Sequence, residues 1–232
     1  MDITANSGFA TYLQKVYGTV AAGLLISAAI TFLLSTSPDA AAMFYHTDAK
    51  HVVKFALLGW VALLLPLVLV FVIPIALAAE APLVVVNGLY GVFCASFGVS
   101  LYAATSQYTG SSVGAALLIT SGTFTGLSLT GLVIKTPLTG LKSFCTMGLW
   151  GLVIVGIGDL LFHFNFNQTV MAIIAIVVFA GLTVTDSQDI RERYESEGDT
   201  QMGVMLGAMG LYLDAVNLFI RILQLVGVKN DD

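Results

Sequence analysis

The segment 203–228, GVMLGAMGLYLDAVNLFIRILQLVGV, is long and apolar enough to cross a lipid bilayer, yet it carries Asp214 near its middle. A spanning helix needs about 20 apolar residues, and a carboxylate at that depth costs about 2.5–3.5 kcal/mol. We therefore expect Asp214 to face a protein interior or a wet cavity. On a helix, Asp214, Asn217 and Arg221 are spaced i, i+3 and i+7, so they form one polar stripe in apolar surroundings.

The composition extends this conclusion to the whole chain. Of its 232 residues, 57% are hydrophobic and 10% are charged, and the mean hydropathy is +0.92. Soluble domains carry roughly 25% charged residues. The sequence therefore predicts an all-α integral membrane protein. The net charge is −5 and there is no basic run, so no nucleic-acid partner is expected.

Apolar runs separated by short polar connections predict seven transmembrane helices. The predicted spans are 18–36, 53–77, 86–106, 112–133, 142–162, 169–188 and 203–227. They form a single domain, 18–228, between a polar N-terminal tail, 1–17, and a short C-terminal tail, 229–232. Pro66 and Pro74 are expected to kink or interrupt the second span.

Small residues and charges give two further expectations. Gly122 with Gly126, and Gly203 with Gly207, have the GxxxG spacing that lets helices approach closely. Tight packing within the bundle is expected at both, in preference to a dimer seam. The cations favour a cytoplasmic N-terminus, with five on the inner side against four on the outer. The inner five are Lys15, Lys135, Lys142, Arg191 and Arg193, and the outer four are Lys50, Lys54, Arg221 and Lys229.

Asp186, near the end of the sixth span, has two readings. It is either an interfacial carboxylate in contact with water, or it faces Asp214 from the preceding antiparallel helix. A rise of about 1.5 Å per residue puts Asp186 a few ångströms inside the cytoplasmic edge and Asp214 about 16 Å inside it, which permits a pair without establishing one. Paired carboxylates in a low dielectric tend to share a proton. A hard cation such as Ca²⁺ also suits them, but two ligands are too few for tight binding, so the predicted Ca²⁺ site at Asp186 and Asp214 is transient.

Asp159 suggests a different chemistry, because it closes a GIGD sequence at 156–159. Intramembrane aspartyl proteases use a GxGD aspartate with a second aspartate on a neighbouring helix. Here the helical rise separates Asp159 from Asp186 by more than about 15 Å in depth, and no PAL tripeptide follows. We therefore expect no enzymatic activity and no cofactor, and interpret Asp159 as a span-end carboxylate near His163. Cys94 and Cys145 are expected to be small buried side chains.

Four ordered motifs resemble the Bax-inhibitor family. The segment LYLDAVNLFIRILQLVG at 211–227 resembles the family's closing LYLDFINLFLxLLxLFG, and FAGLTVTDSQDIRERY at 179–194 resembles FAGLTAYDTQxIKxxY. YTGSSV at 108–113 is similar to YTGASI, and 124–152 is similar to FGxLSLYGYTTKxDLSGxGSFLxMGLxGL. The likeness covers roughly residues 9–228.

The resemblance implies a seven-helix fold in which two groups of three helices enclose the seventh. It also implies a pH-sensitive calcium leak channel, as described for bacterial members, in which the family's paired aspartates match Asp186 and Asp214. We accordingly expect Asp186 and Asp214 to gate a cation pathway that Asn217 lines. A monomer in the bacterial cytoplasmic membrane is expected.

This chain departs from the family pattern, and two alternatives stay open. The family gate uses an arginine on the second helix, whereas here the corresponding span offers only Lys54, at its first turn. In the first alternative, the protein regulates a membrane-bound protease by contact through its tail, 1–17. In the second, the same carboxylates serve a proton-coupled cation exchanger.

Overall fold

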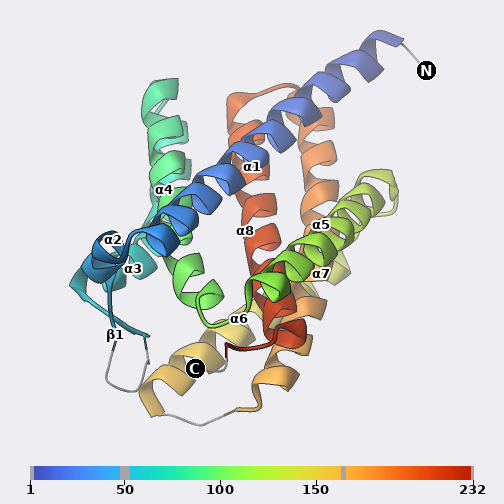
Figure 1. Ribbon diagram of the computed structural model, residues 1–232. Helices are drawn as coiled ribbons and strands as arrows, with labels where there is room; N and C mark the ends of the chain where they lie inside the picture. The colour runs from blue at the N-terminus through green and yellow to red at the C-terminus, as the bar shows by residue number, and fades with distance from the viewer. Residues whose placement is uncertain (1–2, 48–52, 163–165, 231–232) are drawn as a thin grey trace. The chain divides into compact units, whose positions relative to one another are not determined.

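The computed structural model describes residues 3–47, 53–162 and 166–230 (Figure 1). Apart from one short hairpin, its elements are helices. In chain order they are α1 (Ile3–Thr36), α2 (Pro38–Phe44), β1 (Tyr45–Thr47), β2 (Val53–Phe55), α3 (Leu57–Ala78), α4 (Leu83–Thr105), α5 (Gly110–Val133), α6 (Thr139–Phe162), α7 (Gln168–Glu197) and α8 (Gln201–Val226).

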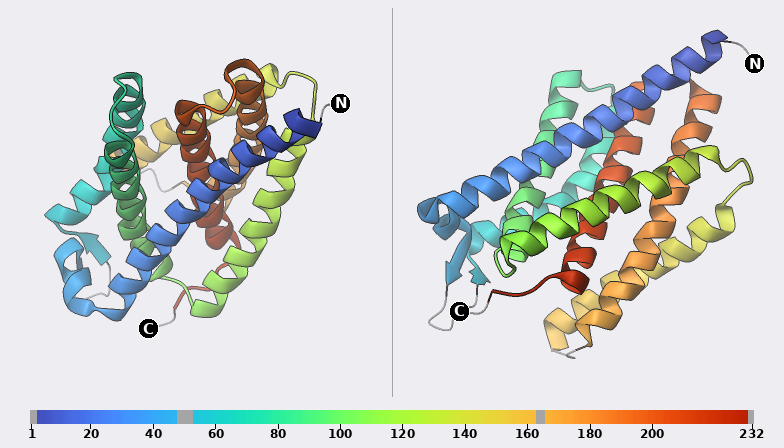
Figure 2. Two further views of the ribbon diagram at one scale, coloured as in Figure 1. Left: turned by 90° about the horizontal axis from the view of Figure 1, so that it is seen from above. Right: turned by 45° about the vertical axis from the view of Figure 1, so that its right-hand side comes forward.

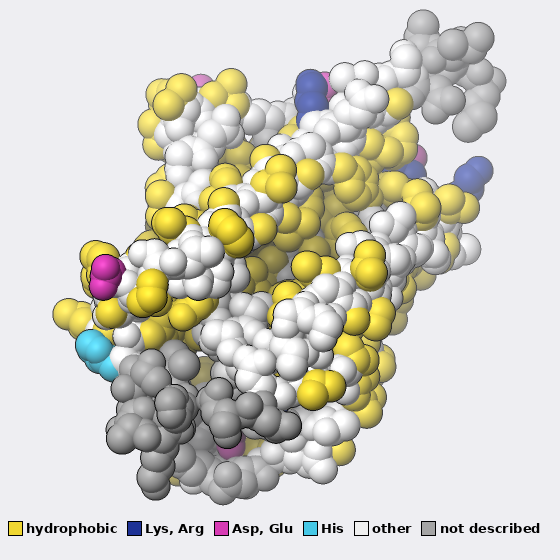
Figure 3. All heavy atoms as spheres, in the orientation of Figure 1, with side chains coloured by type: hydrophobic (Ala, Val, Ile, Leu, Met, Phe, Trp, Pro, Cys, Tyr) yellow, Lys and Arg dark blue, Asp and Glu magenta, His cyan; other side chains and the backbone are white. Residues whose placement is uncertain are grey.

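Seven helices within the described residues are long and apolar enough to cross a membrane. Their outward surfaces carry many large hydrophobic side chains, and charged side chains are sparse on the face drawn in Figure 3. Such a surface is unfavourable in water and suited to lipid. The chain is therefore an all-α integral membrane protein, as its composition predicts. The candidate spans are Ser7–Thr36, Leu57–Ala78, Leu83–Thr105, Gly110–Val133, Thr139–Asp159, Gln168–Glu197 and Gln201–Val226.

Two compact units make up the chain. One comprises Met1–Val16 with Tyr108–Asp232, and the other comprises Tyr17–Gln107. The long helix α1 contributes its first residues to the former unit and the rest to the latter. The enclosure of the last helix by two groups of three stays a prediction, as does the single-domain organisation of 18–228.

The unit Tyr17–Gln107 is built on the packing of α3 against α4. Its second span begins later than predicted, because residues 53–55 pair with β1 as an antiparallel strand that places Lys54 opposite His46. Helix α3 continues through Pro66 and Pro74, so the two prolines do not interrupt the span, while the kink expected as the other outcome stays a prediction. A proline removes one backbone hydrogen bond, and the surrounding turns can compensate for that loss within a membrane helix.

The other unit is organised around α7, which packs against α5, α6 and α8. Figure 2 shows α7 and α8 side by side, and α5 also packs against α8. Apolar side chains of α6, α7 and α8 form a shared core that includes Cys145, Phe179 and Leu218. Cys94 and Cys145 are both buried, as expected from the sequence.

The glycines that bring helices together are only partly those of the GxxxG pairs. Among the described atoms, nothing lies within 4 Å of a methyl group built at Gly122 or Gly126, so the tight packing predicted there is wrong. Instead a methyl group built at Gly131, which belongs to neither pair, would meet the backbone carbonyl of Val184 on α7. Gly207 of the second pair does lie in a close contact, against the Ile190 side chain.

The predicted N-terminal tail is largely helical, since α1 begins at Ile3. Phe9 and Tyr12 pack against Tyr194 with ring centroids 5.1 and 5.2 Å apart, and Val16 is fully buried. Phe9, Tyr12 and Val16 recur at i, i+3 and i+7, which gives this polar segment an apolar stripe. Lys15, beside the stripe, pairs with Asp199. The N-terminal segment therefore packs against the end of α7 and the connection between α7 and α8, and it is not the separate polar tail that the sequence predicted.

We predict that Gly131→Ala lowers the free energy of unfolding, whereas Gly122→Ala does not. Each alanine gains up to about 1 kcal/mol of helix propensity. The new methyl at 131 must displace α5 from α7, at a cost of about 1–3 kcal/mol. Thermal unfolding of both purified variants in the same detergent measures the difference. Equal stability of the two variants would contradict the close approach of α5 to α7.

Candidate functional site

Asp214 is buried in the membrane-spanning helix α8, with 3% of its surface exposed. Its Oδ2 atom has no hydrogen-bond partner among the described residues. The Thr183 side chain of α7 lies beside it, but the Thr183 hydroxyl donates to the Phe179 carbonyl at 2.8 Å. A hydroxyl has one proton to donate, so Thr183 serves either the carbonyl or Asp214. An unsatisfied carboxylate in such a place is costly unless a proton or a cation joins it.

Asp186 approaches α8 from α7. Its Oδ2 atom would lie 2.7 Å from a methyl group built at Gly210, so the carboxylate rests against the α8 backbone. Gly210 and Asp214 are one turn apart and share a face, and Asp186 acts electrostatically on Asp214. The structure thus brings together the two aspartates that the sequence singled out. Gly210, which the sequence analysis missed, is recognisable by its position four residues before Asp214.

Three further charged groups act electrostatically on Asp186. Asp189 lies one turn further along α7, Arg193 lies two turns along, and Lys142 comes from α6. The Lys142 ammonium forms an ion pair with the Asp189 carboxylate. The cations near these carboxylates therefore come from α6 and α7. Asp189 was recognisable by its i+3 spacing from Asp186, whereas the nearness of Lys142 depends on how α6 packs and has no local signal.

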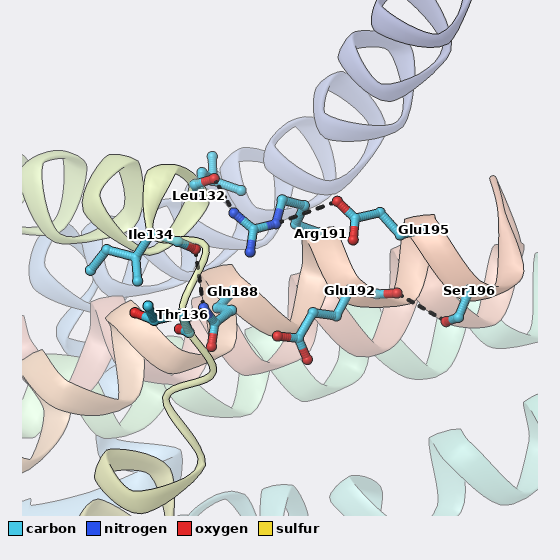
Figure 4. Close-up of polar contacts among 8 residues, drawn as sticks. All are labelled: Leu132, Ile134, Thr136, Gln188, Arg191, Glu192, Glu195 and Ser196. Carbon is cyan, nitrogen blue, oxygen red and sulfur yellow. Dashed lines mark hydrogen bonds and ion pairs between the residues drawn. The ribbon is translucent and has the colours of Figure 1, made fainter.

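Gln188 holds the connection between α5 and α6 onto α7 (Figure 4). Its side chain, 4% exposed, donates from Nε2 to the carbonyls of Ile134 at 3.1 Å and Thr136 at 2.9 Å. Its Oε1 accepts from the Leu138 backbone N–H at 2.9 Å. One turn later, the Lys142 N–H bonds to the Leu138 carbonyl. Gln188 therefore fixes the start of α6, and with it the backbone that carries Lys142.

Two polar contacts continue the attachment of α5 to α7. Arg191 donates from Nη1 to the Leu132 carbonyl at 2.9 Å, as Figure 4 shows. A cation is favourable there because the last carbonyls of a helix carry partial negative charge. The hydroxyls of Ser128 and Ser187 hydrogen-bond at 2.8 Å between the two helices. The placement of Arg191 on the cytoplasmic side of the membrane stays a prediction. Its side chain is engaged by the Leu132 carbonyl of α5.

The other residues singled out by the sequence have contacts or positions of their own. Asn217 donates from Nδ2 to the Leu213 carbonyl of its own helix at 2.8 Å, and its role in lining a pathway stays a prediction. Arg221 bonds from Nη1 to Gln224 at 2.9 Å. Asp159 is exposed near the end of α6. His46 lies in β1, while the other two histidines, His51 and His163, lie outside the described residues.

Metal-binding capacity at the pair is limited. Within the part of the chain that the structure describes, no three His, Cys, Asp or Glu side chains come together as a set that could hold a metal ion. Tight calcium sites use six to eight oxygen ligands. Any cation at the aspartates would therefore keep part of its water shell and exchange readily.

We predict that Gln188→Ala lowers the free energy of unfolding by about 1–3 kcal/mol, since it strands buried backbone groups of the α5–α6 connection. Gln107→Ala is the control, because this exposed glutamine makes a single hydrogen bond to the Ala103 carbonyl. Thermal unfolding in detergent compares them. If the two substitutions had the same effect, Gln188 would not fasten this connection.

Comparison with known proteins identifies the family. The family model described as "Inhibitor of apoptosis-promoting Bax1" matches residues 10–231. An uncharacterized protein of Rickettsia prowazekii is 32% identical, over 98% of this chain and 94% of its own. The inner membrane protein YbhL of Escherichia coli is 26% identical, over 97% of this chain and 94% of its own. An uncharacterized protein of Caulobacter vibrioides is 28% identical, over 97% and 92%. The resemblance seen in the sequence motifs is confirmed, and the chain belongs to the Bax inhibitor family.

Proposed function

We propose that this protein is a pH-sensitive cation leak channel in which Asp186 and Asp214 form the gate. The observation that carries the proposal is the buried, unpartnered Oδ2 of Asp214, with the Asp186 carboxylate acting on it from the neighbouring helix. An ionisable residue inside a membrane-spanning helix is rare and is generally found on an ion or proton pathway.

The physical logic of the gate follows from the burial of the pair. Two carboxylates in a low dielectric repel each other when both are ionised, and a shared proton or a bound cation relieves that repulsion. Proton and cation therefore compete for one place. A change in pH alters which of them holds α7 and α8 together, and so couples proton concentration to the packing of the two helices.

Ca²⁺ is the cation that we propose. Carboxylate oxygens are hard ligands that suit Ca²⁺, and conduction needs binding that is weak enough to release the ion. The sparse ligand set of the described residues favours such release. The relative YbhL is an inner membrane protein, which supports the same membrane for this chain, with the N-terminus in the cytoplasm as the proposed orientation.

We predict that Asp214→Asn and Asp186→Asn flatten the pH dependence of Ca²⁺ flux, because asparagine is isosteric but does not titrate. The measurement is Ca²⁺ entry into dye-loaded proteoliposomes, from mildly acidic to mildly alkaline pH. Asp159→Asn is the matched control, since it removes an exposed carboxylate at the far end of α6 and should leave the wild-type profile.

Two results would count against the gate. Flux that keeps the wild-type pH profile in both variants would remove Asp186 and Asp214 from the gate. No flux above empty liposomes at any pH would reject the channel itself. Flux that saturates with Ca²⁺ and depends on an imposed proton gradient would instead favour a proton-coupled exchanger that uses the same carboxylates.

Regulation of a membrane-bound protease is the alternative proposal, with the N-terminal segment as the contact. Because Tyr12 and Val16 are buried, deletion of the segment would also remove packing against α7 and α8. Substitution of the exposed Thr11 and Gln14 by arginine tests the contact without that loss. Lost binding of the protease with unchanged ion flux would favour the regulator.

A further inference from the structure

Three carboxylates follow one another from the contact of α7 with α6 to the contact of α7 with α8: Asp189 pairs with Lys142 of α6, Asp186 lies against Gly210 of α8, and Asp214 belongs to α8 itself. Asp189 has 30% of its side chain exposed, Asp186 is partly buried, and Asp214 is almost fully buried with an oxygen left unpartnered. Asp189 acts electrostatically on Asp186, and Asp186 acts on Asp214. The series therefore runs from a partly exposed carboxylate to the buried one, a turn or so apart at each step.

A cation already occupies the exposed end of this series. The ammonium of Lys142 contacts the Asp189 carboxylate and also acts electrostatically on Asp186. It therefore stands where a free cation would interact with both carboxylates. The Lys142 side chain is 44% exposed, and a lysine of this kind is a mobile point charge on a flexible stem. Ion pairs this exposed contribute about 1 kcal/mol or less, so another cation can displace the ammonium.

We propose that Asp189 and Asp186 form an access site for divalent cations such as Ca²⁺, and that the Lys142 ammonium is a tethered competitor for that site. The route onward to Asp214 rests on the proposed channel function, but cation binding at Asp189 does not require conduction. Lys142 withdraws when a divalent cation binds and returns when the cation leaves.

The attachment of the α5–α6 connection explains why the ammonium stays close enough to compete. Gln188, adjacent to Asp189 in α7, fixes Leu138 through its N–H. The first turn of α6 then runs from Leu138 to Lys142. The backbone of Lys142 is thus held beside Asp189 whether or not the ammonium is bound, so its effective concentration at the site stays high.

The test is Ca²⁺ binding to the full-length protein in detergent, measured by isothermal titration calorimetry. Lys142→Gln should bind Ca²⁺ about fivefold more tightly, the size expected for removal of one partly exposed ionic competitor. Lys142→Arg keeps the charge and should behave as wild type. Lys15→Gln is the matched control, because Lys15 forms the equivalent pair with Asp199 at side-chain exposures of 52% and 34%, against 44% and 30% for Lys142 and Asp189.

A double variant decides whether the gain belongs to this site. In Asp189→Asn the substitution Lys142→Gln should no longer tighten binding. Unchanged affinity in Lys142→Gln, no binding heat in either Lys142→Gln or wild type, or a gain that persists with Asp189→Asn would each overturn the proposal. The proposal is separable from the channel. If Lys142→Gln binds Ca²⁺ more tightly but the protein gives no Ca²⁺ flux in liposomes, the channel function is rejected and the access site is kept. If there is flux but Lys142→Gln binds Ca²⁺ no more tightly, the access site alone is rejected.

Discussion

The burial of a carboxylate within a membrane-spanning helix is the constraint on which the rest of this unit depends. Asp214 cannot face lipid at acceptable free energy, so α8 must turn that face toward other helices. The apolar residues beside it, among them Leu211 and Leu218, are buried with it. Gly210, one turn earlier, leaves room for Asp186 against the helix backbone. The two aspartates and the apolar residues beside them are therefore buried by the same packing of α8 against its neighbouring helices.

Helix α7 is the element that connects this pair to its surroundings. Along one stretch it presents Gly181 to Cys145 of α6, Val184 to Gly131 of α5, and Asp186 to α8. One turn further, Gln188 and Asp189 hold the start of α6 through hydrogen bonds and an ion pair. A change in the charge at the aspartates would therefore act on a helix whose contacts with α5, α6 and α8 are all close by, which is what a proton-sensitive gate requires.

Much of the architecture could be predicted from the sequence, because apolar runs and the closing motif are local signals. The seven spans and the family follow from them. The N-terminal segment was misjudged because its apolar stripe, Phe9, Tyr12 and Val16, is sparse within polar residues. The GxxxG pair at Gly122 marked no helix contact in the described structure, whereas Gly131 did. Spacing shows that a helix can be approached closely, but not which partner approaches it.

The residues of the candidate site were likewise predictable from the sequence only in part. The aspartates were identifiable as charges in apolar helices, and Gly210 and Asp189 have helical spacing relative to them. Lys142 has no such signal, since its position depends on the fold of the α5–α6 connection and on the buried amide of Gln188. What replaces the family's second-helix arginine in this chain stays an open question. In this chain the cations close to Asp186 are on α6 and α7.

The central claim is that Asp186 and Asp214 act as one unit, and a double-mutant cycle tests it most directly. The free energy of unfolding would be measured in detergent for wild type, Asp186→Asn, Asp214→Asn and the double variant. If the carboxylates form a pair, the two effects are non-additive by more than about 0.5 kcal/mol, the limit within which independent sites add. Additive effects within that limit would contradict the pair and the gate built on it.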